Sequence, residues 1–230
     1  MNNSEELQKL KYFINNESPY GVLEFRDQRL IVLPTVFPPI FNTNLLSVVV
    51  EELVSKFIEK QNLCRVFEMG PGCGAAILTV AKIKGVIASA SDIAPMAVLN
   101  TKANALWWGV ECDAYQGNLF ENVPEEQFDI IFWNIPFVKE NPGDIEDVKF
   151  RSAFDPNYQY LTKFLEQVNN RLTEHGQIVL AVDYILCDLD TVYILIDKAG
   201  FSSEVYKEGK IIWQQEEITY AYLLLTRKFG

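Results

Sequence analysis

Residues 128–133 are apolar apart from Asp129, as is typical of a buried strand, and the amide of Asn134 comes directly after them. Ile135, Pro136 and Phe137 follow. An amide both donates and accepts hydrogen bonds, and an aromatic ring offers a flat face for stacking. This segment, called the amide motif below (residues 134–137), could therefore hold a planar group that carries a nitrogen. As an ordinary strand exit, with Pro136 as the breaker, it would have no chemical role.

A glycine-rich turn lies upstream of the amide motif. Residues 65–69 are strand-like and include Glu68, and Gly70, Gly72 and Gly74 follow at alternate positions. Because glycines carry no side chain, main-chain N–H groups and the start of the next helix can approach a ligand closely. Ligands of open α/β sheets gather at the carboxyl ends of the strands. We therefore expect the glycine turn (residues 70–74) and the amide motif to face one crevice.

The glycine turn alone is compatible with more than one cofactor. It also satisfies the dinucleotide pattern Gly-x-Gly-x-x-Ala, and Asp92 stands 20 residues after Gly72, where a ribose-binding acid is expected. Judged by the glycine turn and Asp92 alone, the chain could therefore have an NAD-binding fold.

Taken together, the motifs resemble those of class I S-adenosylmethionine-dependent methyltransferases, over roughly residues 30 to 227 judged by the order of elements. The branch that they resemble carries Asn-Pro-Pro-Tyr or Asn-Pro-Pro-Phe and methylates amide or base nitrogens, as the release-factor glutamine methyltransferases do. Residues 38–46 are similar to a segment of the shorter enzymes of that kind that covers the cofactor and substrate entrance, with Asn42 in place of an Asp. The resemblance favours S-adenosylmethionine over a dinucleotide.

The resemblance implies a role for each residue of the donor site. Glu68 would lie near the amino group of the donor, and Asp92 would accept hydrogen bonds from both ribose hydroxyls. Asn118 stands where the family has an acid that faces the adenine amino group, and its side-chain oxygen can still accept. As purely structural alternatives, Asp92 would cap the following helix and Asn118 would belong to a plain turn. The remaining residues expected at the donor are Thr43, Gly70, Gly72, Gly74, Ile93 and Leu119.

The resemblance assigns the methyl acceptor to the amide motif. Methyl transfer from a sulfonium is an in-line displacement, so the protein mainly holds the nucleophile and excludes water. Asn134 Oδ1 and the carbonyl of Ile135 would accept hydrogen bonds from the acceptor nitrogen, and Phe137 would stack on it. The family has Pro at the position of Ile135, but Pro136 biases Ile135 toward the extended conformation that the turn needs. Trp133 is expected in the core.

The alternation of elements predicts an α/β, Rossmann-like fold with a mostly parallel seven-stranded sheet and helices on both faces. Residues 201–206 and 218–227 are expected to form an antiparallel edge hairpin at its end. Residues 1–60 would pack on a catalytic domain of residues 61–230, in one compact domain. The expected elements are helix 4–14, hairpin 21–33, helix 45–59, strand 65–69, helix 74–84, strand 86–91, helix 95–107, strand 111–116, strand 128–133, helix 157–172, strand 177–182 and helix 188–199.

Composition indicates an ordinary globular chain. With 230 residues, 49% of them hydrophobic, it can bury a sizeable core. Because no basic leader and no apolar run of roughly 18 residues is present, we expect a soluble, cytoplasmic protein with no membrane contact. Four scattered cysteines and a single histidine predict neither a disulfide framework nor a metal site.

Acidic residues surround the amide motif. The net charge is −11, and residues 111–150 alone hold ten acids against Lys139 and Lys149, a net charge of −8. Because phosphate backbones are bound mainly by Lys and Arg, the acidic surroundings argue against nucleic acid as the substrate, unless the acids are merely a solvated surface. The loop of residues 141–144 could act as a lid or select a positively charged acceptor, or be a plain surface loop.

These observations predict an S-adenosylmethionine-dependent N-methyltransferase that acts on an amide or amine nitrogen of a protein glutamine or of a small metabolite. Two alternatives remain open. A non-catalytic S-adenosylmethionine-binding protein is motivated by the departures at Ile135 and Asn118. A nucleobase N-methyltransferase shares the amide motif.

Overall fold

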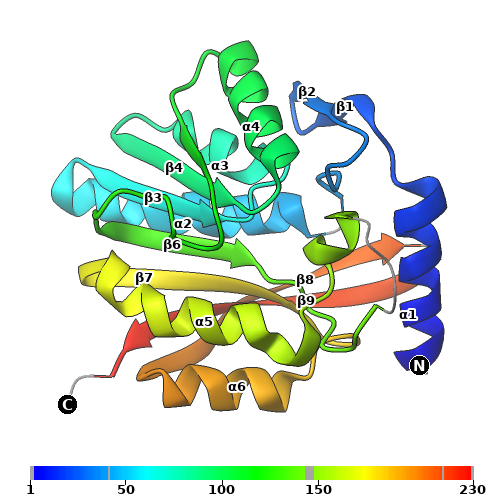
Figure 1. Cartoon of the computed structure of the whole chain (residues 1–230). Coiled ribbons are helices and arrows are strands. Elements are labelled where there is room, and N and C mark those ends of the chain that lie inside the picture. Colours follow the sequence, from blue (N-terminus) through cyan, green and yellow to red (C-terminus); the bar gives the residue numbers. More distant parts are fainter. Residues whose placement is uncertain (1–2, 41, 143–147, 214, 229–230) are drawn as a thin grey trace.

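The computed structural model describes residues 3–40, 42–142, 148–213 and 215–228. Its main element is a seven-stranded sheet of order β5-β4-β3-β6-β7-β9-β8 (Figure 1). Neighbours from β5 to β7 are parallel, whereas β9 is antiparallel to both β7 and β8. The expected fold class is therefore confirmed. The strands are β3 (Cys64–Met69), β4 (Val86–Asp92), β5 (Asp113–Gln116), β6 (Phe128–Asn134), β7 (Leu172–Asp183), β8 (Phe201–Trp213) and β9 (Glu216–Arg227).

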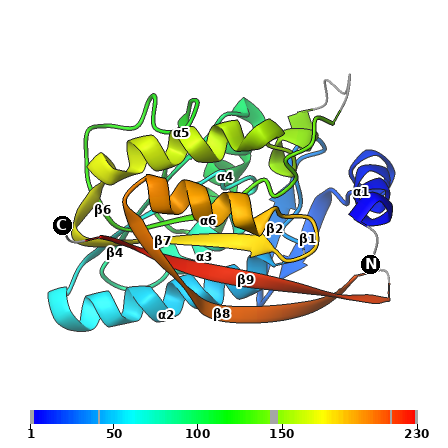
Figure 2. The same ribbon diagram turned by 90° about the horizontal axis from the view of Figure 1, so that it is seen from below.

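Helices cover both faces of the sheet, as Figure 2 shows. In β6, Ile130 and Phe132 pack with α2 and α3, whereas Ile131 and Trp133 pack in the other core cluster, with α5 and α6. This division follows from the alternation of side chains along a strand. None of the helices in the described part of the chain is long and apolar enough to cross a membrane. The helices are α2 (Thr43–Gln61), α3 (Ala75–Ala81), α4 (Pro95–Trp108), α5 (Gln159–Val168) and α6 (Leu189–Lys198).

Local sequence explains where the helices begin and end. Pro95 is the first residue of α4, a position where an N–H would have no hydrogen-bond partner within the helix. Gly109 follows the last residue of α4 with φ 65°. That left-handed conformation costs glycine least. At the start of α6, the carboxylate of Asp188 accepts a hydrogen bond from the N–H of Thr191 and so caps the helix.

The amino-terminal elements pack on two different parts of the molecule. α1 (Asn3–Tyr12) and the π-helical turn Phe13–Glu17 lie against the end of the β8–β9 hairpin. Lys9 Nζ is 2.7 Å from Glu216 Oε1, and the rings of Phe13 and Trp213 meet edge to face at 6.0 Å. The two-stranded sheet of β1 (Gly21–Phe25) and β2 (Gln28–Val32) packs instead on α4.

Several predicted boundaries were wrong. α3 and α5 are shorter than the expected helices 74–84 and 157–172, and 3₁₀ turns flank α5 on both sides. β7 begins at Leu172 rather than 177, β5 begins at Asp113 rather than 111, and β8 continues to Trp213 rather than 206. Gly209 lies within β8, where a Cβ would come 2.4 Å from Leu45 Cδ1. This glycine therefore makes room for α2 and does not break the strand.

Candidate active site

A cavity opens at the carboxyl ends of β3, β4, β5 and β6, which are neighbours in the sheet. The glycine turn, the amide motif and the segment between β2 and α2 contribute to its wall. The structure thus brings both motifs to one crevice. Gly74 and Ile135 are the two predicted site residues that are not part of the wall. The predicted residues that line it are Thr43, Glu68, Gly70, Gly72, Asp92, Ile93, Asn118, Leu119, Asn134, Pro136 and Phe137.

The glycine turn uses the conformational freedom of its glycines. The φ angles of Gly70, Gly72 and Gly74 are 64°, 57° and 84°, all in the left-handed region. A Cβ at Gly70 would lie 3.3 Å from Trp133 Nε1, in the wall of the cavity. A Cβ at Gly74 would lie 3.0 Å from Thr101 Cγ2, so this glycine serves the close packing of α3 on α4. Gly70 and Gly72 therefore expose main chain to the cavity, beside Pro71 and Cys73, which also line it.

Glu68 is a nearly buried carboxylic acid, 4% exposed, that lines the cavity. Its Oε2 accepts one hydrogen bond, from the N–H of Ile77 at 2.9 Å. Burial, together with the smaller effect of the Asp92 charge, raises the pKa of Glu68 to about 8, whereas the hydrogen bond from Ile77 acts in the opposite direction. The carboxyl group is therefore largely protonated near neutral pH until a positive charge lies beside it.

Asp92 ends β4 and holds two turns together. Its Oδ2 accepts from the N–H of Gly72 at 3.2 Å, and its Oδ1 accepts from the N–H of Ala94 at 2.9 Å. Burial raises the pKa of Asp92, whereas both hydrogen bonds lower it. Ala94, not Asp92, precedes the first residue of α4, so Asp92 does not cap that helix directly. Each oxygen keeps a lone pair for a ligand in the cavity.

Asn118 and Leu119 follow β5 at the same edge of the cavity. The main-chain N–H of Asn118 donates to Glu121 Oε2 at 3.2 Å, and its side chain is exposed. Leu119 is 6% exposed and has φ 57°, an uncommon value for a branched side chain. Its carbonyl accepts a 2.7 Å hydrogen bond from Ser91 Oγ, which holds the turn against β4.

The amide of Asn134 has a second amide as its partner. Asn42 Nδ2 donates to Asn134 Oδ1 at 2.9 Å, and Asn42 is 1% exposed. The hydroxyl of Tyr222 in turn donates to the carbonyl of Asn42 at 3.2 Å. Sequence reasoning missed Asn42, although the replacement of an Asp in the segment of residues 38–46 was the available signal. Thr43, which it did select, donates its hydroxyl to the carbonyl of Ile40.

The rest of the amide motif is buried. Ile135 is fully buried, and Phe137 is 8% exposed and lines both the main cavity and a small hollow between α1 and the β8–β9 hairpin. Trp133 belongs to the core, as expected, with its ring centroid 5.0 Å from that of Phe164, but it also lines the cavity. That second position was not anticipated.

The surroundings of the site are described in part. The expected loop of residues 141–144 extends beyond the described residues after Pro142, whose carbonyl accepts a hydrogen bond from Lys11 Nζ at 3.3 Å. In the part of the chain that the structure describes, no cluster of His, Cys, Asp and Glu is arranged to hold a metal ion.

The fold is shared with solved methyltransferases. An S-adenosylmethionine-dependent methyltransferase from Agrobacterium tumefaciens superposes with a TM-score of 0.62 at 14% identity, over 92% of this chain and 72% of that chain. The sheet order, with its crevice at the carboxyl ends of the parallel strands, defines the class I S-adenosylmethionine-dependent methyltransferases. A model of the methyltransferase small domain family matches residues 38–187, and the chain belongs to this family. The expected enzyme class is therefore confirmed.

Two relatives are similar in sequence. A candidate protein N5-glutamine methyltransferase from Methanocaldococcus jannaschii is 25% identical over 206 residues, which cover 88% of this chain and 100% of that protein. A release factor glutamine methyltransferase from Clostridium acetobutylicum is 34% identical over 144 residues, which cover 60% of this chain and 47% of that enzyme. The second match therefore spans less than half of the Clostridium enzyme.

Proposed function

We propose that this enzyme methylates the amide nitrogen of a glutamine side chain in a protein, with S-adenosylmethionine as the donor. The observation that carries the proposal is the amide of Asn134, which lines the cavity at the end of β6 with its Oδ1 held by Asn42. The names of both sequence relatives, a protein glutamine methyltransferase and a release factor glutamine methyltransferase, support a glutamine acceptor.

The residues around the glycine turn fit the donor. Glu68 and Asp92 place two carboxyl groups on the cavity wall, and the glycines leave its backbone uncovered. When bound, S-adenosylmethionine supplies a methyl group on a positively charged sulfur. Glu68 would pair with the amino group of the donor, and the two oxygens of Asp92 would accept from the ribose hydroxyls. Leu119 and Asn118 would flank the adenine.

The acceptor side requires orientation more than acid–base chemistry. The lone pair of an amide nitrogen is delocalised, so hydrogen-bond acceptors on its N–H groups are needed to direct it toward the methyl carbon. Asn134 Oδ1 has two lone pairs, and Asn42 uses one of them. The other lone pair would accept from the acceptor nitrogen, and the main-chain carbonyl of Ile135 would accept the second N–H.

The contact with Asn42 also defines which group of Asn134 remains for the substrate. With Oδ1 facing Asn42, the Nδ2 group of Asn134 is left to donate. A glutamine substrate has a primary amide, which carries an N–H and a carbonyl side by side. Its N–H can donate to Asn134 Oδ1 while its carbonyl accepts from Asn134 Nδ2. An amine lacks the carbonyl, so this arrangement favours an amide substrate. Phe137 would cover the planar amide and help exclude water.

The test is transfer of tritiated methyl from S-adenosylmethionine to purified peptide-chain release factor and to a source-cell extract separated into protein, nucleic acid and small molecules. Asn134→Ala should lower turnover by about 10²-fold or more, with donor affinity little changed. Asn170→Ala is the matched control, because it removes an exposed amide just before the amino end of β7, at the opposite end of the strands.

The distribution of the label decides between the candidate functions. Label on a protein glutamine that depends on Asn134 supports the proposal. Label in the small-molecule or nucleic acid fraction would replace glutamine by a metabolite or a nucleobase. Absence of label in all fractions, with intact donor binding, would favour a non-catalytic binding protein.

A further inference from the structure

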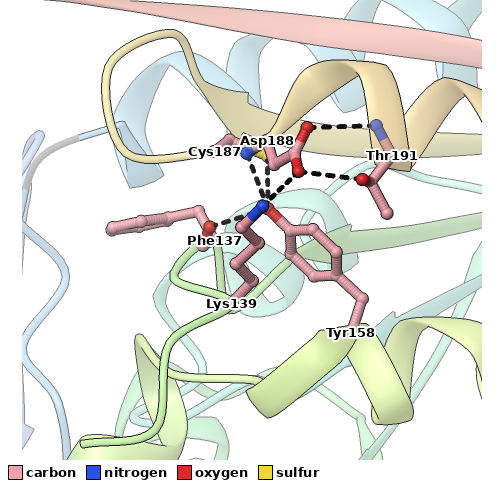
Figure 3. Close-up of polar contacts among 6 residues, drawn as sticks. All are labelled: Phe137, Lys139, Tyr158, Cys187, Asp188 and Thr191. Atoms are coloured by element: carbon pink, nitrogen blue, oxygen red, sulfur yellow. Dashed lines mark hydrogen bonds and ion pairs between the residues drawn. The ribbon is translucent and has the colours of Figure 1, made fainter.

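A buried tyrosine lies directly behind the amide motif and bridges it to the start of α6 (Figure 3). Tyr158 is fully buried. Its hydroxyl donates to the carbonyl of Phe137 at 3.0 Å and accepts from the N–H of Asp188 at 2.8 Å. The sulfur of Cys187 lies 3.4 Å from the same oxygen. One hydroxyl thus joins two main-chain groups that come from different loops.

A hydroxyl is the group that this position requires. It donates and accepts at once, so it satisfies the carbonyl of Phe137 and the N–H of Asp188 together. Phenylalanine would fill the same space but leave both main-chain groups without this partner, which is unfavourable in a buried site. The oxygen therefore contributes something that packing alone does not.

The backbone that carries Tyr158 is unusual. Asn157 and Tyr158 have φ angles of 56° and 51°, so two successive residues other than glycine are left-handed. The fully buried Asp155 stabilises this turn by accepting hydrogen bonds from the N–H groups of Tyr160 and Leu161 at the start of α5. An unfavourable local conformation that is stabilised in this way indicates that the position of the ring matters.

Further contacts hold the residues that follow the amide motif. The N–H of Val138 donates to the carbonyl of Ala153 at 2.9 Å, and the carbonyl of Val138 accepts from the N–H of Asp155 at 2.8 Å. Lys139 Nζ forms an ion pair with Asp188, which also caps α6 (Figure 3). Residues 137–139 are therefore attached to the segments just before α5 and α6, through main chain and side chains together.

We propose that Tyr158 is a positioning residue, whose hydroxyl fixes the carbonyl of Phe137 and thereby the placement of Asn134 and Phe137 against the methyl acceptor. The expected effect on methyl transfer rests on the proposed function. The expected effect of the hydroxyl on the carbonyl of Phe137 does not depend on it. Tyr158 is not among the residues that line the cavity. It therefore acts on the acceptor only through the amide motif.

The test compares Tyr158→Phe with the wild type in kinetics, donor binding and hydrogen exchange. We expect kcat for methyl transfer to the release factor to fall about tenfold, as the loss of a buried hydrogen-bond pair predicts, with the Kd of S-adenosylhomocysteine unchanged. Amide exchange measured by mass spectrometry should accelerate by a similar factor at residues 137–139 and at Asp188. Tyr206→Phe, which removes an exposed hydroxyl bonded to Lys56, is the matched control.

Each outcome decides the proposal. Faster exchange at both loops with lower kcat and unchanged donor affinity supports it, whereas wild-type exchange at these residues overturns it. A loss of donor affinity that parallels the loss of kcat also overturns it, because general destabilisation would then be the cause. If the wild type methylates no glutamine, the proposed function fails and the exchange comparison alone decides the role of Tyr158.

A second variant provides a test if Tyr158→Phe is recovered unfolded. Lys139→Met removes the partly exposed ion pair with Asp188 and leaves the buried hydroxyl in place. We expect a smaller, roughly threefold fall in kcat, as a weak surface pair predicts, with faster exchange at residues 137–139. The wild type supplies the deciding measurement in that case. The amide of Asp188, whose partner is the Tyr158 hydroxyl, should be protected from exchange, and an unprotected amide would overturn the proposal.

Discussion

Donor binding should release a proton from Glu68. The carboxyl group is 4% exposed and has a pKa of about 8, chiefly because burial disfavours its charge. At pH 7, roughly nine of ten free enzyme molecules therefore carry the proton. The positive amino group of the donor, placed beside Glu68, would favour the ionised form and lower this pKa. Binding at pH 7 should then release close to one proton, and binding above pH 8 much less.

Calorimetry measures this release directly. Titration of S-adenosylhomocysteine at pH 7 in buffers of different ionisation enthalpy should give heats that differ by about 0.9 times the difference between the buffers, as the pKa of about 8 requires. As pH increases toward 8, the affinity for S-adenosylhomocysteine should rise by up to tenfold per pH unit. Above pH 8 the amino group of the ligand starts to lose its own proton, so the rise should end there. Glu68→Gln should show heats independent of the buffer. Buffer-independent heats in the wild type would show that Glu68 releases no proton when the donor site is filled.

The same group makes the stability of the free enzyme depend on pH. The folded-state pKa of Glu68, about 8, lies above the ordinary glutamate value of 4.5, so the folded protein binds the proton more tightly than the unfolded chain does. This contribution is fully present below pH 4.5 and is lost as pH rises through 8. The loss is about 1.4 kcal/mol per pH unit between these values. The free energy of unfolding in urea, measured as a function of pH, should therefore fall more steeply for the wild type than for Glu68→Gln, by this slope.

Three further changes test other parts of the site and fold. Asp92→Ala should weaken donor affinity about ten- to a hundredfold by calorimetry, as the loss of charge-assisted hydrogen bonds predicts, and wild-type affinity would contradict the ribose contact. Asn42→Ala removes the donor to Asn134 Oδ1, so kcat should fall about tenfold at unchanged donor affinity; an unchanged kcat would show that the contact is dispensable. Gly176→Ala would place a Cβ 2.8 Å from the carbonyl of Phe128 and should lower the free energy of unfolding by about 1 to 3 kcal/mol in urea, whereas unchanged stability would mean that β7 can shift.

The parts of the fold that could be predicted are those with local signals. The apolar run before Asn134 and the glycine turn each mark the end of a parallel strand, and parallel strands of one sheet end at the same edge. The segments of β3, β4 and β6 followed from that pattern. The extent of β8 did not, because its outer half is defined by pairing with β9, and Gly209 in its middle looked like a break.

The contacts of the two missed residues lack such a local signal, although the replacement of an Asp marked the position of Asn42 itself. Asn42 meets Asn134 across 92 residues, and Tyr158 reaches Asp188 across 30, so neither contact has a periodic pattern in the chain. The left-handed backbone at Tyr158 also runs against the preference of its residue type. Positions that are determined by distant partners and oppose local propensity are the ones that sequence reasoning cannot find.

The packing of α1 on the β8–β9 hairpin has a consequence for synthesis. Lys9 and its partner Glu216 are 207 residues apart, so the hairpin is made long after α1. At the usual rates of translation, α1 therefore waits roughly 10 to 40 s for the surface that buries it. During that interval the hollow beside Phe137 lacks one wall. The acceptor end of the site is thus completed only after the hairpin has been made, and a shorter nascent chain cannot yet hold its substrate in the final geometry.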